Sequence, residues 1–257
     1  MLSALKGKNT ERIDNIMKVI VCNNKEEMSL AGAREIQECI NQKPDCVLGL
    51  ATGSTPLGMY ENLCKMYKEG VLDFSKVKTF NLDEYCNLDV SDKNSYHTFM
   101  YENLFFHINV KKENIHIPDG ESKDADKECK DYEKAIVEAG GIDLQVLGIG
   151  RNGHIGFNEP DQMLYKDTHV TDLTQTTIDD NARFFEKKED VPTQAITMGM
   201  GTIMNARKII VLANGEGKKD AIRALLSGKV TTQVPVSLLQ LHTNVVLICD
   251  KEAYPND

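Results

Sequence analysis

The chain has no tryptophan and no long apolar run, and its seven cysteines include no Cys-x-x-Cys pair. Spanning a bilayer takes about 18 or more consecutive apolar residues, so a membrane partner is not expected. The odd number of cysteines predicts reduced thiols in a cytoplasmic protein. The six histidines are scattered, and none is paired with another His or a Cys at ligand spacing, so we predict no metal site.

Positive charge is also in deficit, with 30 basic against 39 acidic residues and a net charge of -9. This balance argues against binding to nucleic acid or to anionic membranes. It does not exclude a small phosphorylated substrate, because backbone N–H groups and a few local basic side chains suffice to bind phosphate. A length of 257 residues suits one large domain and is short for two.

Short apolar segments alternate along the chain with segments of helical periodicity. The predicted strands are 17–22, 46–51, 77–82, 144–149, 209–213 and 245–249. The predicted helices are 25–40, the segment that follows Pro56, 95–107, 123–139 and 217–226. This alternation predicts an α/β fold with one open, doubly wound, mostly parallel, Rossmann-like sheet flanked by helices.

We expect a single catalytic domain over residues 17–257. Residues 1–16 are polar and charged, and we expect them to be an N-terminal extension that is not part of the fold. Residues 161–191 are the least regular part of the chain. A polar segment of this kind beside a site is typical of a mobile lid.

The most informative segment is 148–160, with the sequence GIGRNGHIGFNEP. It follows a predicted strand, and ligands in open α/β sheets bind at the carboxyl ends of strands. His154 is a candidate general base there, with Glu159 to hold its tautomer and Asn152 close by. The plainer interpretation is a glycine-rich turn with a surface histidine, but loops on a rigid scaffold often carry function.

Two carboxylates, Asp83 and Glu84, follow another predicted strand within residues 81–85, NLDEY. One of them could abstract a proton from carbon if its pKa were raised. Taken alone, however, this pair is more typical of a turn with solvated charges.

A third strand end carries the sequence LATGSTP at residues 50–56. A tight turn followed by hydroxyls and a helix start can form an anion cradle, although the same residues also serve as an ordinary helix cap. The predicted phosphate-binding residues of this loop are Thr52, Gly53, Ser54 and Thr55. Arg183 and Lys218 could complete the site, and each on its own is more typical of a surface charge.

Together these segments resemble the glucosamine-6-phosphate deaminases. The matching segments are 50–56, 81–85, 95–96, 148–160, 181–185 and 239–242. They occur in order over about residues 17–250. The His-containing segment with its Asn-Glu-Pro ending is the most specific of them.

The resemblance implies that D-glucosamine 6-phosphate and water give D-fructose 6-phosphate and ammonia, in amino-sugar catabolism, with no metal or organic cofactor. By position, His154 would open the sugar ring, with Glu159 and Asn152 supporting it. Asp83 would take the proton from C2 and help to return it to C1. The 52–55 loop, Arg183 and Lys218 would hold the phosphate. Nothing in the sequence decides between a monomer and a homo-oligomer.

Two departures from the family pattern concern pH dependence and regulation. Some members carry Asp where this chain has Asn152, and Asn cannot raise the pKa of a neighbouring His by its charge. The hexameric members bind an allosteric activator, N-acetylglucosamine 6-phosphate, with basic residues at positions where this chain has His169 and Thr171. We therefore predict little or no allosteric activation.

Two alternatives remain. A 6-phosphogluconolactonase would share the fold and a similar His loop, but it would not be expected to carry the Asn-Glu-Pro ending or the NLDEY segment. A sugar-phosphate sensor of a transcription regulator would need a DNA-binding segment. Residues 1–16 are too short for a helix-turn-helix, and the chain is acidic.

Overall fold

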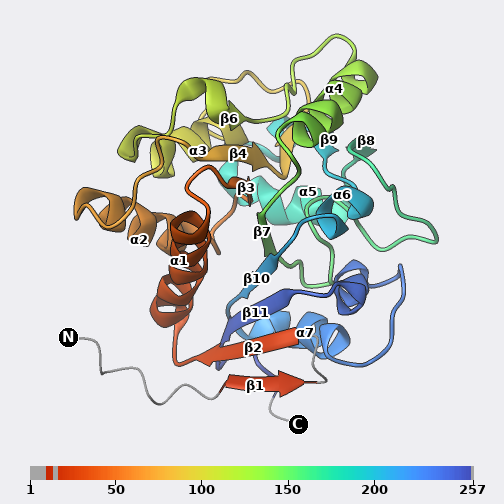
Figure 1. The fold of residues 1–257 in the computed structure, drawn as a ribbon. Coiled ribbons are helices and arrows are strands. Elements are labelled where there is room, and N and C mark those ends of the chain that lie inside the picture. The colour runs from red at the N-terminus through yellow and green to blue at the C-terminus, as the bar shows by residue number, and fades with distance from the viewer. Residues whose placement is uncertain (1–9, 14–16, 256–257) are drawn as a thin grey trace.

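The computed structural model describes residues 10–13 and 17–255, and the side chains of 10–13 and of Asp180 are outside the description. Among these residues, eight strands form one sheet in the order β1-β2-β11-β10-β7-β3-β4-β6 (Figure 1). The strands are β1 (Thr10–Ile13), β2 (Met17–Cys22), β3 (Val47–Leu50), β4 (Lys78–Asn81), β6 (Ile115–His116), β7 (Leu144–Gly148), β10 (Ile209–Ala213) and β11 (Val245–Asp250). All neighbours pair in parallel except β1 with β2, which confirms the predicted fold class.

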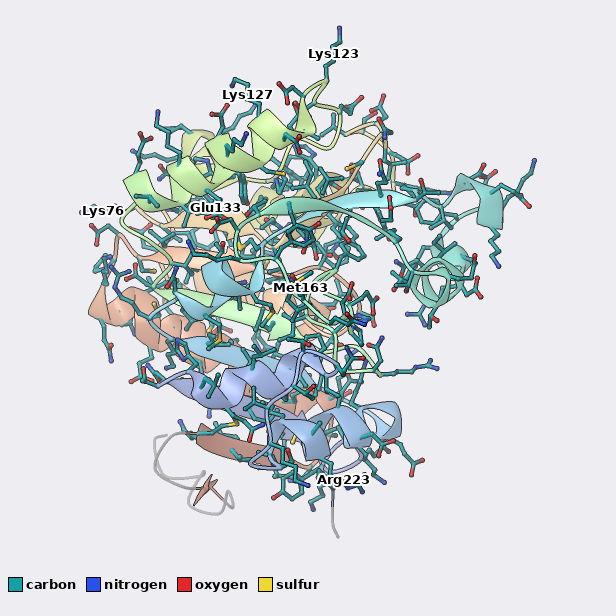
Figure 2. The ribbon with its side chains drawn as sticks, turned by 90° about the vertical axis from the view of Figure 1, so that its right-hand side faces the viewer. Lys76, Lys123, Lys127, Glu133, Met163 and Arg223 are labelled. Atoms are coloured by element: carbon teal, nitrogen blue, oxygen red, sulfur yellow. The ribbon has the colours of Figure 1, made fainter. Side chains whose placement is uncertain are left out.

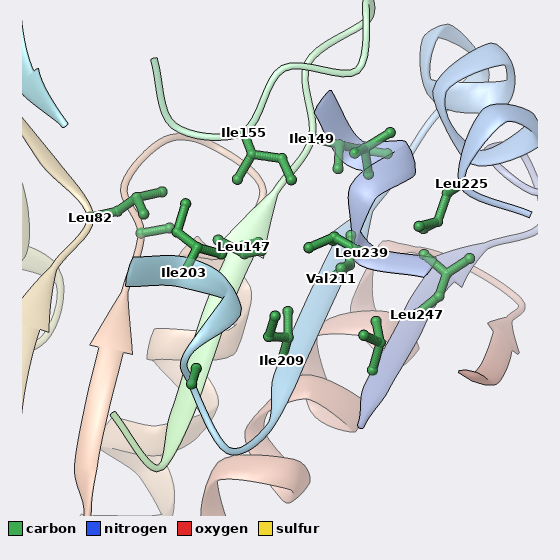
Figure 3. Packing of buried hydrophobic residues seen from close by; sticks show 14 of the residues in the cluster. Leu82, Leu147, Ile149, Ile155, Ile203, Ile209, Val211, Leu225, Leu239 and Leu247 are labelled. Carbon is green, nitrogen blue, oxygen red and sulfur yellow. The ribbon is translucent and has the colours of Figure 1, made fainter. Parts of the chain in front are cut away.

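Helices cover both faces of this sheet, so its central strands are buried on each side. The helices are α1 (Lys25–Gln42), α2 (Leu57–Lys68), α3 (Tyr96–Asn103), α4 (Ala125–Glu138), α5 (Gln175–Asn181), α6 (Met200–Met204) and α7 (Lys219–Leu225). In β10, Ile209 and Val211 face the core that contains α4, α6 and α7 (Figure 3). Ile210 and Leu212 face the opposite core, which contains α1, α2 and α3. A strand buried on both faces has a nearly continuous apolar sequence, and this pattern made β3, β7, β10 and β11 predictable.

A second, antiparallel sheet lies beside the carboxyl end of the first. It contains β5 (Asp83–Tyr85), β9 (Gln194–Thr197) and β8 (His169–Asp172), in that order. The predicted irregularity of 161–191 is wrong in part, because β8, α5 and two short 3₁₀ turns, Ala182–Phe184 and Lys188–Asp190, lie within it.

Glu133 of α4 anchors the start of that segment. Its Oε1 accepts hydrogen bonds from the backbone N–H of Thr168 at 2.7 Å and from the hydroxyls of Thr168 and Thr202 at 2.6 Å each. Figure 2 shows Glu133 on the inner side of α4, whereas Lys127 projects from its outer side. The segment is therefore fixed at residue 168, while Met163 before it is 82% exposed.

The prediction that residues 1–16 lie outside the fold differs from the structure at residues 10–13. Residues 10–13 form β1, an edge strand antiparallel to β2 with Thr10 opposite Ile20. Backbone groups alone make such a pairing, so this polar segment carries no apolar pattern by which to predict it. The rest of the extension lies outside the described residues, and the domain start at residue 17 stays a prediction. In the described part of the chain, no helix has the length and apolar character needed to cross a bilayer.

Candidate active site

The candidate site lies where the direction of the chain through the sheet reverses. After β3 the chain moves to β4 and β6 on one side, and after β7 it moves to β10 and β11 on the other. Neighbouring strands β3 and β7 therefore form the switch point, beside which ligands bind in open α/β sheets. Most of the predicted site residues lie in the segments that follow β3, β4, β7 and β10. Because these strands are parallel, the segments meet at one edge of the sheet.

The turn after β7 is shaped around the ring of His154. Gly150 donates its N–H to the His154 carbonyl at 3.0 Å, and Gly153 donates to the Gly150 carbonyl at 3.1 Å with a φ of 82°. A methyl group at Gly150 would lie 2.3–2.5 Å from three atoms of the imidazole. The ring therefore lies directly over Gly150, and a glycine is required there because nothing larger fits.

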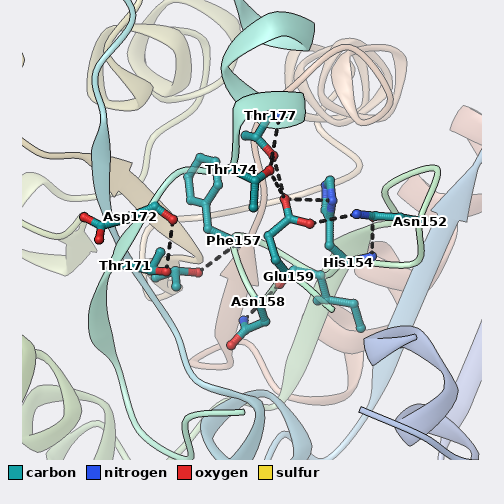
Figure 4. Close-up of polar contacts among 11 residues, drawn as sticks. Asn152, His154, Phe157, Asn158, Glu159, Thr171, Asp172, Thr174 and Thr177 are labelled. Carbon is teal, nitrogen blue, oxygen red and sulfur yellow. Dashed lines mark hydrogen bonds and ion pairs between the residues drawn. The ribbon is translucent and has the colours of Figure 1, made fainter. Parts of the chain in front are cut away.

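Glu159 faces this ring, and the pair forms the predicted dyad (Figure 4). His154 Nδ1 is 3.3 Å from Glu159 Oε1, and the two side chains are 28% and 14% exposed. Burial alone would raise the pKa of Glu159. The contact with His154 and hydrogen bonds from Thr177 and Asn152 outweigh burial and hold the pKa at about 2. Glu159 is thus a carboxylate at neutral pH, suited to orient His154 and to stabilise its protonated form.

Asn152 supports the dyad indirectly. Its Nδ2 donates to Glu159 Oε2 at 2.8 Å, and its Oδ1 accepts from the backbone N–H of His154 at 3.1 Å. Both hydrogen bonds go to groups other than the imidazole. Asn152 therefore holds the carboxylate and the loop backbone, and it acts on the ring through them.

Asp83 and Glu84, adjacent in sequence, have different surroundings. Glu84 accepts backbone N–H groups from Tyr85 at 2.8 Å, Tyr96 at 3.0 Å and His97 at 2.8 Å, so it holds the start of α3. Asp83 is only 6% exposed. Burial, and secondarily the charge of Glu84, raise the pKa of Asp83 to about 8. Asp83 is the better candidate for a base, because Glu84 is engaged in a structural role.

The loop of His154 also reaches Asp83. Asp83 pairs with Thr197 across β5 and β9, and Thr197 Oγ1 accepts from the backbone N–H of Phe157 at 3.2 Å. A methyl group at Gly156 would lie 2.8 Å from Thr197 Oγ1 and 3.3 Å from Asp83 Oδ2. The backbone two residues after His154 therefore packs against the buried carboxylate, which brings dyad and carboxylate to one place.

The loop after β3 has the predicted form of a tight turn before a helix. Gly53 has a φ of 95°, a conformation that favours glycine, and α2 begins at Leu57. Gly53 and Ser54 are exposed, and Thr52 and Thr55 are half-buried. Lys25 donates to the Ser54 carbonyl at 2.9 Å, which fixes the loop to α1.

The two predicted basic residues lie on different elements. Lys218 is half-buried in the 3₁₀ turn Glu216–Lys218 that follows β10, a neighbour of β7 in the sheet. Arg183 is exposed after α5, and its guanidinium lies 4.7 Å from the centre of the Phe184 ring. Nearby, Asn181 donates to the Tyr85 hydroxyl at 2.9 Å and ties the end of α5 to β5. A role for either cation in phosphate binding stays a prediction.

Sequence reasoning missed Thr174 and Thr177, which both contact Glu159. Their signal is the pattern Thr-x-x-Thr at the start of α5, where Thr174 accepts from the Thr177 N–H at 3.2 Å as a helix cap. The pattern predicts the cap but does not reveal that a distant carboxylate lies against it. No cluster of three or more His, Cys, Asp or Glu side chains suited to a metal occurs among the described residues.

A buried carboxylate beside a His–Glu dyad, at the switch point of a parallel sheet, defines an acid–base enzyme of the open α/β class. The chain belongs to the family described as glucosamine-6-phosphate isomerases/6-phosphogluconolactonase, whose model matches residues 24–248.

Relatives named glucosamine-6-phosphate deaminase cover most of the chain. The one from Thermoanaerobacter pseudethanolicus is 56% identical over 237 residues, 92% of this chain and 94% of the relative. The one from Clostridium perfringens is 53% identical, over 92% and 98%. A solved structure described as a monomeric glucosamine-6-phosphate deaminase superposes with a TM-score of 0.89 at 43% identity, over 91% and 98%. A 6-phosphogluconolactonase from Trypanosoma brucei has a TM-score of 0.71 at 22% identity, over 91% and 96%, and shares the fold alone.

Proposed function

We propose that this protein converts D-glucosamine 6-phosphate and water into D-fructose 6-phosphate and ammonia. The observation that carries the proposal is the position of Asp83, buried against the loop of the His154–Glu159 dyad. An isomerisation of this kind needs two proton-transfer groups, one for oxygen and one for carbon. The His loop and the buried carboxylate supply one each.

His154 acts first in the proposed sequence. It takes the proton from the anomeric hydroxyl and delivers it to the ring oxygen, which opens the pyranose to the aldehyde. The ionised Glu159 stabilises the imidazolium that forms on the way. Asn152 keeps Glu159 and the loop backbone in place through its two hydrogen bonds.

Asp83 acts on carbon in its ionised form. It removes the proton from C2 of the open-chain sugar to give an enolamine, and it then returns a proton to C1. Water adds at C2 of the resulting imine, and ammonia leaves. Burial suits Asp83 to this step, because a carboxylate shielded from water has a raised pKa and is a stronger base.

The phosphate is proposed to bind at the 52–55 loop, where the exposed turn precedes α2, with Arg183 and Lys218 as its cations. Residues 161–191 are proposed to close over the substrate as a lid. In the cell we propose a cytoplasmic enzyme with reduced cysteines and little allosteric response to N-acetylglucosamine 6-phosphate.

A two-substrate assay on the purified protein tests the proposal. Ammonia and fructose 6-phosphate should appear in equal amounts from glucosamine 6-phosphate, and 6-phosphogluconolactone should not be hydrolysed. Hydrolysis of the lactone without deamination would replace the proposal with a lactonase. Tight binding of sugar phosphates without turnover of either would replace it with a sensor.

A further inference from the structure

The carboxylate of Glu159 is held by a helix that lies outside its own loop. Thr177 of α5 is 7% exposed, and its hydroxyl donates to Glu159 Oε1 at 2.5 Å. This is the oxygen that faces His154 Nδ1 at 3.3 Å. Glu159 Oε2 is occupied by Asn152 from the loop itself. The oxygen that acts on the imidazole therefore receives its hydroxyl donor from α5 (Figure 4).

The hydroxyls and the first turn of α5 form one directed chain of hydrogen bonds. The Thr177 N–H donates to Thr174 Oγ1 at 3.2 Å, and the two hydroxyl oxygens are 3.0 Å apart. Because the single Thr177 proton goes to Glu159, the Thr174 hydroxyl is the donor between the two threonines. Thr174 Oγ1 is itself 3.5 Å from Glu159 Oε1. Because the ionised Glu159 can only accept, it fixes which way the Thr177 and Thr174 hydroxyls donate their protons.

We propose that Thr177 is a positioning residue, which holds Glu159 against His154 and couples the placement of α5 to the dyad. The inference rests on the proposed function and deepens it. Helix α5 belongs to the segment 161–191, so any movement of that helix away from the site removes a donor from Oε1. The dyad is then complete only while α5 is in the position seen here.

The groups around Glu159 make the effect of removing this donor simple to interpret. From its own loop Glu159 faces the titratable His154 and the neutral Asn152, and from α5 and its N-cap it faces the neutral hydroxyls of Thr177 and Thr174. Replacing Thr177 by valine keeps the shape and removes one hydrogen bond to an ionised acceptor. Such bonds favour the charged form, so the pKa of Glu159 should rise on their loss.

The experiment compares Thr177→Val and Thr177→Ser with Thr176→Val, a matched control because Thr176 is exposed on the same helix. Thr177→Val should lower kcat by about tenfold or more with little change in KM. Thr177→Ser should retain most of the activity, and Thr176→Val should match the unaltered protein. Equal kcat values for Thr177→Val and Thr176→Val would overturn the inference.

A second readout does not depend on turnover. The side-chain carboxyl ¹³C resonance of Glu159, followed against pH, should titrate at a higher pH in Thr177→Val than in Thr176→Val. If the unaltered protein does not deaminate its substrate, the proposed function fails, while this titration still decides the role of Thr177. If Thr177→Val does not fold, Thr177→Cys takes its place, because a thiol is only a weak hydrogen-bond donor. The kcat and the Glu159 titration of Thr177→Cys are then compared with those of Thr176→Val, with the same expected and contradicting results.

Discussion

At the scale of residues, the same sequence neighbourhood gives Asp83 and Glu84 opposite tasks. Glu84 accepts three backbone N–H groups and anchors α3, whereas Asp83 lies buried against Gly156 and Thr197. The NLDEY segment could predict that one carboxylate was a base. It could not decide which one, because the difference comes from the backbone of residues 96 and 97 and from β9.

The raised pKa of Asp83 predicts the pH dependence of the reaction. A general base acts when deprotonated, and burial followed by the charge of Glu84 raises the pKa of Asp83 to about 8. The value of kcat/KM reports groups of the free enzyme, so it should rise with pH and level off above about 8. Steady-state rates between about pH 6 and 9, corrected for the separately measured titration of the substrate, provide the measurement. A kcat/KM that is already constant from about pH 6 upward would contradict the raised pKa, because it would mean that little of Asp83 is protonated at pH 6.

At the scale of elements, the turn after β7 could be predicted in detail, and the second sheet could not. The signal for the turn lies in its own sequence, which has glycines at 150, 153 and 156, although the side chains they make room for include the distant Val234 and Thr197 as well as the imidazole of His154. In contrast, β5, β8 and β9 have three or four residues each. Strands this short give little alternation of apolar and polar residues, and β8 has no fully buried position. Their pairing depends on contacts distant in sequence.

Two glycines of this element provide a matched pair of variants. In Gly150→Ala the new methyl group would lie within 2.5 Å of the imidazole, whereas a methyl group added at Gly148 would meet no atom within 4 Å. Gly150→Ala should therefore displace His154 and lower kcat by about a hundredfold, since displacements of about 1 Å can cost that much. Gly148→Ala should retain the activity. Steady-state kinetics of both variants give the comparison, and equal rates would mean that the position of the ring does not limit catalysis.

At the scale of the whole molecule, charge pairs that stabilise the sheet lie at the end opposite the site. Glu35 of α1 is 6% exposed and pairs with Lys18 at 3.0 Å and with Lys208 at 2.5 Å. These lysines lie at the beginnings of β2 and β10, whereas the catalytic groups follow strand ends. Stability and chemistry are therefore separated along the strands.

This separation predicts that Glu35→Gln affects stability without affecting catalysis. Burial raises the pKa of Glu35, but the two lysines outweigh it and the net pKa lies below the usual 4.5. A lowered carboxyl pKa contributes stability that is present above about pH 4.5 and is lost as the pH falls through the folded value. The variant should lose about 1–2 kcal/mol of unfolding free energy at pH 7, because the lysines are partly exposed.

Chemical denaturation at pH 7 and at pH 3 measures the Glu35→Gln effect, with kcat as the control. The difference from the unaltered protein should shrink at pH 3, and kcat should not change. An undiminished difference at pH 3 would show that the glutamine disturbs packing and that charge pairing is not the cause.

The central claim is that Asp83 takes the proton from C2 of glucosamine 6-phosphate, and substrate that carries deuterium at C2 tests it most directly. The unaltered protein should move the label from C2 to solvent or to C1 of fructose 6-phosphate. Asp83→Asn keeps the size of the side chain and removes the base, so it should slow this loss by about a hundredfold or more. Loss of the label from C2 at the unaltered rate in Asp83→Asn would contradict the account.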